Sequence, residues 1–238
     1  MKKFFWLCGG YPSLEASDEI IDAYMDGGCD GIEWTIPPQD PYKDQSHLKE
    51  RILKARENCP DCKKHLERMA NFKRKYSEAE VFPAIYEESV NEIGIEYLKH
   101  FCKENKIDTL FLIGDFEDEK LREIKNSGLK VATSVTYYFT GEEIKRVLQN
   151  NGFIYMQAFP YEAEIKAGFT TDRLQECINS LHTMGIQRPI YCAKGIKKPA
   201  DIALISQSKA DGYILGSSLM DYYGNLKELT NIVSRFQK

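Results

Sequence analysis

The sequence lacks any long apolar run. No window approaches the roughly 18 apolar residues of a membrane-spanning helix. The two N-terminal lysines precede an apolar stretch that ends at Cys8, which is shorter than the roughly 7–15-residue core of a secretory signal. Both absences argue against a membrane partner and predict a soluble protein of the cytoplasm.

The chain also has no excess of positive charge. It carries 32 Lys and Arg residues against 36 Asp and Glu, for a formal net charge of −4, and the two signs are interspersed. A nucleic-acid-binding surface needs a basic patch or stripe. We therefore expect no nucleic-acid partner.

No glycine fingerprint follows the first apolar segment, and no shift in composition marks a domain boundary. A dinucleotide-binding sheet carries G-x-G-x-x-G at its first turn, whereas residues 8–13 read CGGYPS and lack the third glycine. This weighs against an open doubly wound sheet. A hydrophobic content of 42% is enough for a sizeable core.

Seven cysteines are present, an odd number that argues against the disulfide framework of a secreted protein. Cys59, Cys62 and His65 form a close group in the segment CPDCKKH. A zinc site would need a fourth ligand, which does not stand nearby, and a thioredoxin-type motif would open a βαβ unit rather than a mid-chain helix. We expect no metal here, and both a functional and a purely structural role stay open.

Strand-like and helix-like patterns alternate along the whole chain. Short apolar segments typical of a parallel sheet covered on both faces occur at 3–8, 29–36, 80–86, 108–114, 129–135, 153–159, 188–195 and 210–216. Helical patterns occur at 13–27, 61–76, 90–104, 118–128, 141–152 and 171–184, then after 199 and from 217 onward, with a long connection before 61. This alternation predicts the α/β class and one (β/α)8 TIM barrel domain over residues 1–238, with its active site at the carboxyl ends of the strands.

Glu33 lies inside a predicted strand, where an ionised side chain is costly without a partner. If side chains alternate along that strand, it points into the barrel mouth near Trp34, Tyr86 and Tyr155, where burial raises its pKa. Such a carboxyl group can serve as a general acid or base near neutral pH. The alternative is a carboxylate that accepts hydrogen bonds from loop amides.

Other polar side chains follow the predicted strands at the same edge. Asp44, in the loop after the second strand, is a solvated loop aspartate by position alone. Asp115 either lines the mouth or caps the following helix, and capping is favoured. Tyr86, Tyr137 and Tyr155 are either walls of the site or part of an aromatic core.

The loops after the last two strands have features of an anion site. Gly195 and Gly216 allow backbone amides to approach an anion, and Ser217 begins a helix whose dipole favours negative charge. Barrels often hold a phosphate at this place, and Lys194 adds a positive charge. We expect a phosphorylated small-molecule substrate, with glycines used only for tight turns as the alternative.

Three segments are similar to the tryptophan synthase α-subunit family. Residues 9–44 read GGYPSLEASDEIIDAYMDGGCDGIEWTIPPQDPYKD, where the family has glycine–aspartate–proline–serine, a helix, and then glutamate–leucine–glycine–isoleucine–proline–phenylalanine–serine–aspartate–proline. The segments IDTLFLIGDFEDE and KGIKKPADIALISQSKADGYILGSS match as well. The resemblance implies an eightfold barrel without a cofactor, which cleaves indole-3-glycerol phosphate to indole and glyceraldehyde 3-phosphate by a retro-aldol reaction.

The resemblance also assigns roles by position. Glu33 matches the glutamate that protonates the indole carbon, and Asp44 matches the aspartate that hydrogen-bonds the indole nitrogen. Residues expected to bind substrate, including a tryptophan in the place of a pocket phenylalanine, are Trp6, Tyr86, Asp115, Tyr155, Lys194, Gly195, Gly216 and Ser217. The family implies a tryptophan synthase β subunit as partner.

Several positions depart from the family's pattern. Residues 159–164 read FPYEAE in place of a glycine-rich phosphate lid, and the two glutamates would repel a phosphate. Gln45-Ser46 replaces a glycine–proline in the loop that faces the β subunit, Lys194 replaces an apolar residue and Tyr11 an aspartate. Two alternatives therefore stay open: a paralogue acting on another small, possibly phosphorylated ligand, and a non-catalytic binding protein.

Overall fold

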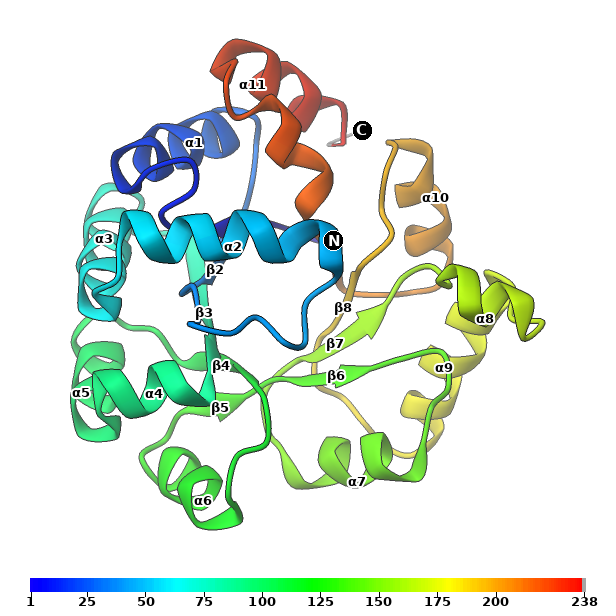
Figure 1. Cartoon of the computed structure of the whole chain (residues 1–238). Helices are drawn as coiled ribbons and strands as arrows, with labels where there is room; N and C mark the ends of the chain where they lie inside the picture. The colour runs from blue at the N-terminus through cyan, green and yellow to red at the C-terminus, as the bar shows by residue number, and fades with distance from the viewer. Residues whose placement is uncertain (237–238) are drawn as a thin grey trace.

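The computed structural model describes residues 1–236 and shows a ring of parallel strands surrounded by helices (Figure 1). The last two residues of the predicted domain, 237–238, lie outside the described part. The strands are β1 (Lys2–Cys8), β2 (Gly31–Thr35), β3 (Glu80–Tyr86), β4 (Thr109–Ile113), β5 (Lys130–Val131), β6 (Thr133–Val135), β7 (Ile154–Gln157), β8 (Ile190–Ala193) and β9 (Gly212–Leu215). Their order around the ring is β5-β4-β3-β2-β1-β9-β8-β7-β6, with parallel pairing throughout, so the predicted TIM barrel is confirmed.

Helices surround the ring, except that α2 (Ser46–Asn58) crosses in front of it in this view and is hydrogen-bonded to Gly10 and Asp221 (Figure 1). They are α1 (Leu14–Asp26), α2 (Ser46–Asn58), α3 (Cys62–Lys75), α4 (Glu87–Ile93), α5 (Ile95–Glu104), α6 (Asp118–Asn126), α7 (Gly141–Gln149), α8 (Glu162–Lys166), α9 (Asp172–Thr183), α10 (Ala200–Gln207), the 3-10 helix η1 (Ser217–Tyr222) and α11 (Leu226–Arg235). Within residues 1–236, none is long and apolar enough to cross a membrane.

Four predicted connections differ from the structure. The long connection before residue 61 contains α2, whose weak apolar pattern leaves only Ile52 and Ala55 buried. The predicted helix 90–104 is broken into α4 and α5 at Gly94, which has a φ of 84° that few residues other than glycine adopt. The loop after β7 contains the short α8, and the C-terminal segment forms η1 before α11.

The ring closes at its fifth strand, which is split between β5 and β6 at Ala132. The first half pairs with β4 and the second half with β7. Ala132 N–H donates to Leu110 O at 2.9 Å, and Gly152 N–H, just before β7, donates to Val131 O at 2.9 Å. The covalent chain and these two bonds join the two edges.

Aromatic rings fill the amino end of the barrel interior. Phe4, Phe82, Phe153 and Tyr191 pack with ring centroids between 4.8 and 5.3 Å apart, and all four are buried. Burying a side chain of this size stabilises the fold by about 1.5–3 kcal/mol. Because side chains alternate along a strand, residues two positions further along point into the same interior, closer to the carboxyl ends.

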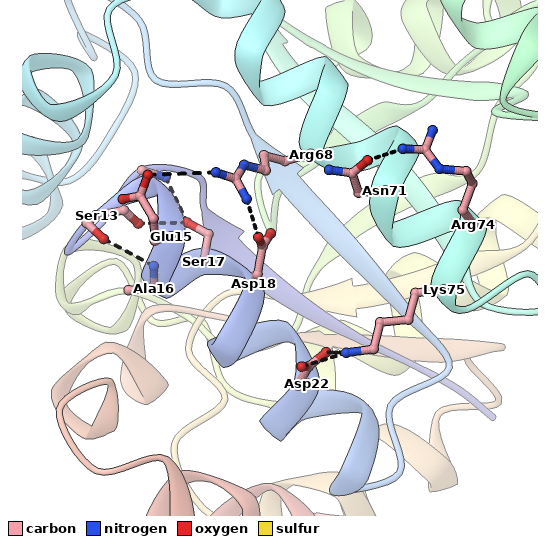
Figure 2. A network of polar contacts seen from close by, with 11 residues as sticks. Ser13, Glu15, Ala16, Ser17, Asp18, Asp22, Arg68, Asn71, Arg74 and Lys75 are labelled. Carbon is pink, nitrogen blue, oxygen red and sulfur yellow. Dashed lines mark hydrogen bonds and ion pairs between the residues drawn. The ribbon is translucent and has the colours of Figure 1, made fainter.

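Charged side chains link α1 to α3 on the outer surface (Figure 2). Arg68 of α3 donates to Asp18 of α1, and Lys75 Nζ lies 2.7 Å from Asp22 Oδ1. Surface ion pairs of this kind contribute about 0–1 kcal/mol each. The apolar interior, rather than this network, therefore accounts for most of the stability.

The seam gives a test of the fold. A Cβ at Gly152 would lie 2.5 Å from the Val131 carbonyl carbon and 2.6 Å from Ala132 N, and these backbone atoms cannot move without opening the ring. We expect Gly152→Ala to lower the free energy of unfolding by about 1–3 kcal/mol. Gly141→Ala is the matched control, because a Cβ there meets nothing within 4 Å. It should raise stability by about 0.4–1 kcal/mol. Urea unfolding measures both, and equal stabilities would contradict the seam's role.

Candidate active site

Glu33 points into the barrel from the middle of β2. In the sheet register it lies opposite Trp6 of β1 and Phe82 of β3, and only 2% of its surface is exposed. The Tyr155 hydroxyl, from β7 across the ring, donates to Glu33 Oε2 at 3.3 Å. The inward orientation of Glu33 and its proximity to Tyr155 were predicted. The alternative, a carboxylate that accepts hydrogen bonds from loop amides, is not what the structure shows.

Trp34 is not in the mouth, contrary to the prediction. It is one residue from Glu33, so its side chain lies on the opposite face of β2, with no exposed surface. There its Nε1 and His65 Nδ1 both approach Gly9, at 2.2 and 2.8 Å from where a Cβ would stand. A side chain at Gly9 would therefore collide with both.

Burial determines the protonation of Glu33. Its pKa is raised from 4.5 to about 8, mainly by loss of water and to a smaller extent by the charge of Asp44, while the Tyr155 hydroxyl and the charge of Lys194 oppose the shift. A carboxyl group with such a pKa is mostly protonated at pH 7. Glu33 therefore has a proton to give at neutral pH.

Asp44 is held at the mouth by Tyr86. The Tyr86 hydroxyl, at the end of β3, donates to Asp44 Oδ2, and the Asp44 N–H donates to Pro41 O at 3.0 Å in the preceding turn. Asp44 is half-buried rather than fully solvated, and burial raises its pKa. The structure thus brings Asp44 into electrostatic range of Glu33, with an oxygen available as a hydrogen-bond acceptor.

Lys194 directly follows β8 and reaches toward the same place. Its Nζ lies 5.6 Å from the centre of the Tyr155 ring, a cation–π contact. Its φ of 69° is left-handed, which costs a residue with a Cβ about 1–2 kcal/mol. Solvent reaches the side chain at the mouth, but protein atoms crowd it from the barrel side, and this loss of water lowers its pKa.

Aromatic side chains surround these groups. Phe111 of β4 stacks on Tyr155 with centroids 4.6 Å apart and planes 5° apart, and Trp6 Nε1 donates to Thr35 Oγ1 at 2.7 Å. Trp6 and Tyr155 were predicted, but Phe111 and Thr35 were not. Strand alternation would have found Thr35, which is two residues from Glu33. Phe111 is placed by the pairing of β3 with β4, in which it lies opposite Ala84.

The expected anion loops lie side by side. Gly195, after β8, has a φ of 82°, and Ser217 begins η1 after the half-buried Gly216. The Ser218 hydroxyl donates to Ile196 O at 3.5 Å and joins the two loops. The first N–H groups of a helix have no partner within it, so those at the start of η1 are not used by the helix itself.

The loop after β7 uses its acids internally. Glu164 is buried and accepts from Gln157 Nε2 at 2.5 Å and from the Tyr161 N–H at 2.7 Å. Glu162 pairs with Lys166 at 2.6 Å in solvent. Glu164 thus fixes the start of α8, and Glu162 is neutralised by Lys166.

Two predicted residues lie away from the site. The side chain of Asp115 is 92% exposed, and its one close cation is Lys43 at 4.0 Å. It does not cap α6 either, because Glu117 is the N-cap residue and no side chain caps that helix. Tyr137 is fully buried and donates to Ala158 O at 2.7 Å, so it belongs to the core.

The Cys59–Cys62–His65 group is buried and structural. Cys62 Sγ accepts from Arg56 Nη1 at 3.0 Å, and His65 Nε2 lies 3.3 Å from Cys59 O. Burial raises the pKa of Cys62 to about 11 and lowers that of His65 to about 4, so neither is reactive as a thiolate or a cation at neutral pH. Within residues 1–236, no group of three or more His, Cys, Asp or Glu could hold a metal ion.

Comparisons with known proteins give one family. The family described as "Tryptophan synthase alpha chain" matches residues 4–238. The tryptophan synthase alpha chain of Photorhabdus laumondii is 24% identical, covering 96% of this chain and 89% of its own, and that of Methanothermobacter thermautotrophicus is 23% identical, covering 98% and 87%. A solved tryptophan synthase subunit alpha from Legionella pneumophila has a TM-score of 0.84 at 18% identity, covering 99% of this chain and 91% of its own. This last likeness concerns the fold alone.

The protonation of Glu33 has a consequence for stability. The folded protein holds a proton on Glu33 that the unfolded chain releases near pH 4.5, so this stabilisation is complete below 4.5 and is lost as the pH rises to about 8. Over that window the free energy of unfolding of wild type should fall by at most about 1.4 kcal/mol per pH unit relative to that of Glu33→Gln, which cannot ionise at this position. Urea unfolding of both proteins at several pH values measures the difference, and a difference independent of pH would contradict the buried, neutral Glu33.

Proposed function

The chain belongs to the tryptophan synthase alpha chain family, and from that premise we propose that it cleaves indole-3-glycerol phosphate to indole and glyceraldehyde 3-phosphate. The observation that carries the proposal is the neutral, buried carboxyl group of Glu33 within electrostatic range of Asp44. Two carboxyl groups in such different environments can divide the roles of proton donor and acceptor.

The reaction needs three proton-related steps, and the two acids supply them. Glu33 gives its proton to the indole ring carbon that carries the glycerol chain, while Asp44 accepts the hydrogen bond of the ring N–H and stabilises the positive charge that develops there. Glu33 is then ionised and takes the proton of the glycerol hydroxyl as the carbon–carbon bond breaks. The ring carbon gains one proton, the hydroxyl loses one, and Glu33 returns to its neutral state.

The remaining site residues have binding roles in this proposal. Trp6 and Tyr155 provide apolar surface for the indole ring, and Tyr86 orients Asp44 through its hydroxyl. The loops at Gly195 and Gly216 and the N–H groups that follow Ser217 receive the phosphate.

A second function is favoured by two observations: the amine of Lys194 lies beside the Tyr155 ring, and in α8 Glu164 accepts a hydrogen bond from Gln157. Both fit a paralogue that keeps the acid pair for a different small phosphorylated compound.

A cytoplasmic location is part of the proposal as well. All seven cysteines are buried and free, as expected in a reducing compartment.

Indole release from indole-3-glycerol phosphate tests the main proposal. Glu33→Gln should lower the turnover number by about a hundredfold to ten-thousandfold, because the proton donor is lost while the shape is kept. Asp44→Asn should lower it by about a hundredfold to a thousandfold. Asp118→Asn, on the exposed first turn of α6, is the matched control and should match wild type. No indole from wild type, with saturable binding of another phosphorylated compound, would favour the paralogue.

The partner expected of this family is a tryptophan synthase β subunit. Mixing the two chains should give a complex on size-exclusion chromatography and raise the rate of indole release. The surface that carries Gln45 and Ser46, at the start of α2, is the part of the chain expected to respond to the partner. Two separate peaks and an unchanged rate would leave the chain as a lyase that acts alone.

A further inference from the structure

The proposed reaction has no step for the amine of Lys194. Within residues 1–236, no carboxylate lies within 4.0 Å of its Nζ, so the amine does not form an ion pair in the free protein. Nζ lies over the face of the Tyr155 ring, 5.6 Å from its centre. The backbone is nevertheless held in a left-handed conformation to place it there. A residue strained at the end of a barrel strand indicates a role for its side chain.

The position of Lys194 Nζ indicates which part of a bound substrate would lie beside it. Tyr155, over which Nζ lies, donates to Glu33, so the amine is close to the carboxyl group that serves the carbon chemistry. The next residue, Gly195, begins the loop expected to receive the phosphate. A three-carbon chain that joins the reacting carbon to a phosphate would therefore pass beside Nζ.

We propose that Lys194 Nζ forms an imine with the carbonyl carbon of a small phosphorylated aldehyde, which gives this site an amine chemistry in addition to its acid pair. Only the choice of aldehyde rests on the proposed function, because that cleavage would release glyceraldehyde 3-phosphate at this point. The chemical class is a short-chain aldehyde with an anionic group at the far end.

The step is balanced without any further reactant. The Nζ lone pair adds to the carbonyl carbon, and one proton of the resulting ammonium moves to the oxygen to form a hydroxyl. This hydroxyl takes a proton from Glu33 and leaves as water, and a protonated imine remains. In the reverse direction, water adds to the imine carbon and Glu33 accepts a proton from it, which releases the aldehyde and the free amine. No electrons are exchanged, so neither an oxidant nor a reductant takes part.

The surroundings favour a reactive amine. A lysine attacks carbonyl carbon only as the neutral amine, and loss of water on the barrel side lowers the pKa of Lys194. Four carboxyl groups face it from other elements and oppose that shift: Glu33 from β2, Asp44 from the following loop, Glu143 from α7 and Glu164 from α8. Glu33 is itself mostly neutral at pH 7, and Glu143 and Glu164 are occupied by backbone and side-chain donors.

Reductive trapping tests the proposal. The full-length protein is incubated with glyceraldehyde 3-phosphate, treated with borohydride, digested and mapped by mass spectrometry. Lys197 and Lys198, exposed in the same loop, serve as internal comparators for unspecific reaction. We expect the reduced adduct on Lys194 at a level at least about tenfold above either comparator, and lower when unphosphorylated glyceraldehyde replaces the phosphorylated compound.

Variants test whether the trapped adduct is on Lys194. Lys194→Arg keeps the positive charge but cannot form an imine, and Lys194→Met has neither the charge nor the amine. Trapping at this peptide should therefore vanish in the two variants. Lys197→Met is the matched control and should keep the adduct on Lys194. Equal labelling of the three lysines in wild type, or no label on Lys194, would overturn the proposal. Indole release by wild type is measured separately, so an absent imine and an absent lyase activity give different results.

Discussion

The site depends on one constraint: a carboxyl group is enclosed among aromatic rings with a tyrosine hydroxyl as its close hydrogen-bond partner. Glu33 has Trp6 and Phe82 on its two neighbouring strands and Tyr155 across the ring. Water would stabilise its charge, but the aromatic interior excludes water, so the neutral acid is the form that the folded chain favours. The same enclosure that makes the charged form of Glu33 costly to bury keeps a proton on this carboxyl group at neutral pH.

The site combines a rigid half and an adjustable half. Glu33, Trp6 and Tyr155 project from strands whose register fixes them in place, whereas Asp44 and Lys194 come from the segments that follow strands. Asp44 depends on Tyr86 for its position, and Lys194 on a left-handed backbone. Such a division allows a family to keep one acid in place while the groups around it change their chemistry.

The sequence predicted the barrel, the inward Glu33 and its contact with Tyr155, because alternation and strand order are local signals that the fold obeys. Trp34 was wrongly placed in the mouth beside Glu33, although alternation puts adjacent side chains of a strand on opposite faces. The other failures concern information that is non-local. Asp115 was assigned to the site by the strand that precedes it, and only the tertiary structure shows that this loop turns the carboxylate into solvent. The short α8 was missed because its register is set by one buried acid, Glu164, rather than by an apolar pattern.

The split fifth strand also determines what a proteolytic cut at this place would do to the barrel. As long as the backbone is continuous at Ala132, β5 and β6 are held in line and both edges of the sheet are occupied. A single proteolytic cut at that residue would break no ladder between strands, but the two halves would then be joined at this point by hydrogen bonds alone. If those bonds opened, the barrel would become an open sheet with two unpaired borders, the kind of surface on which chains add to one another and aggregate.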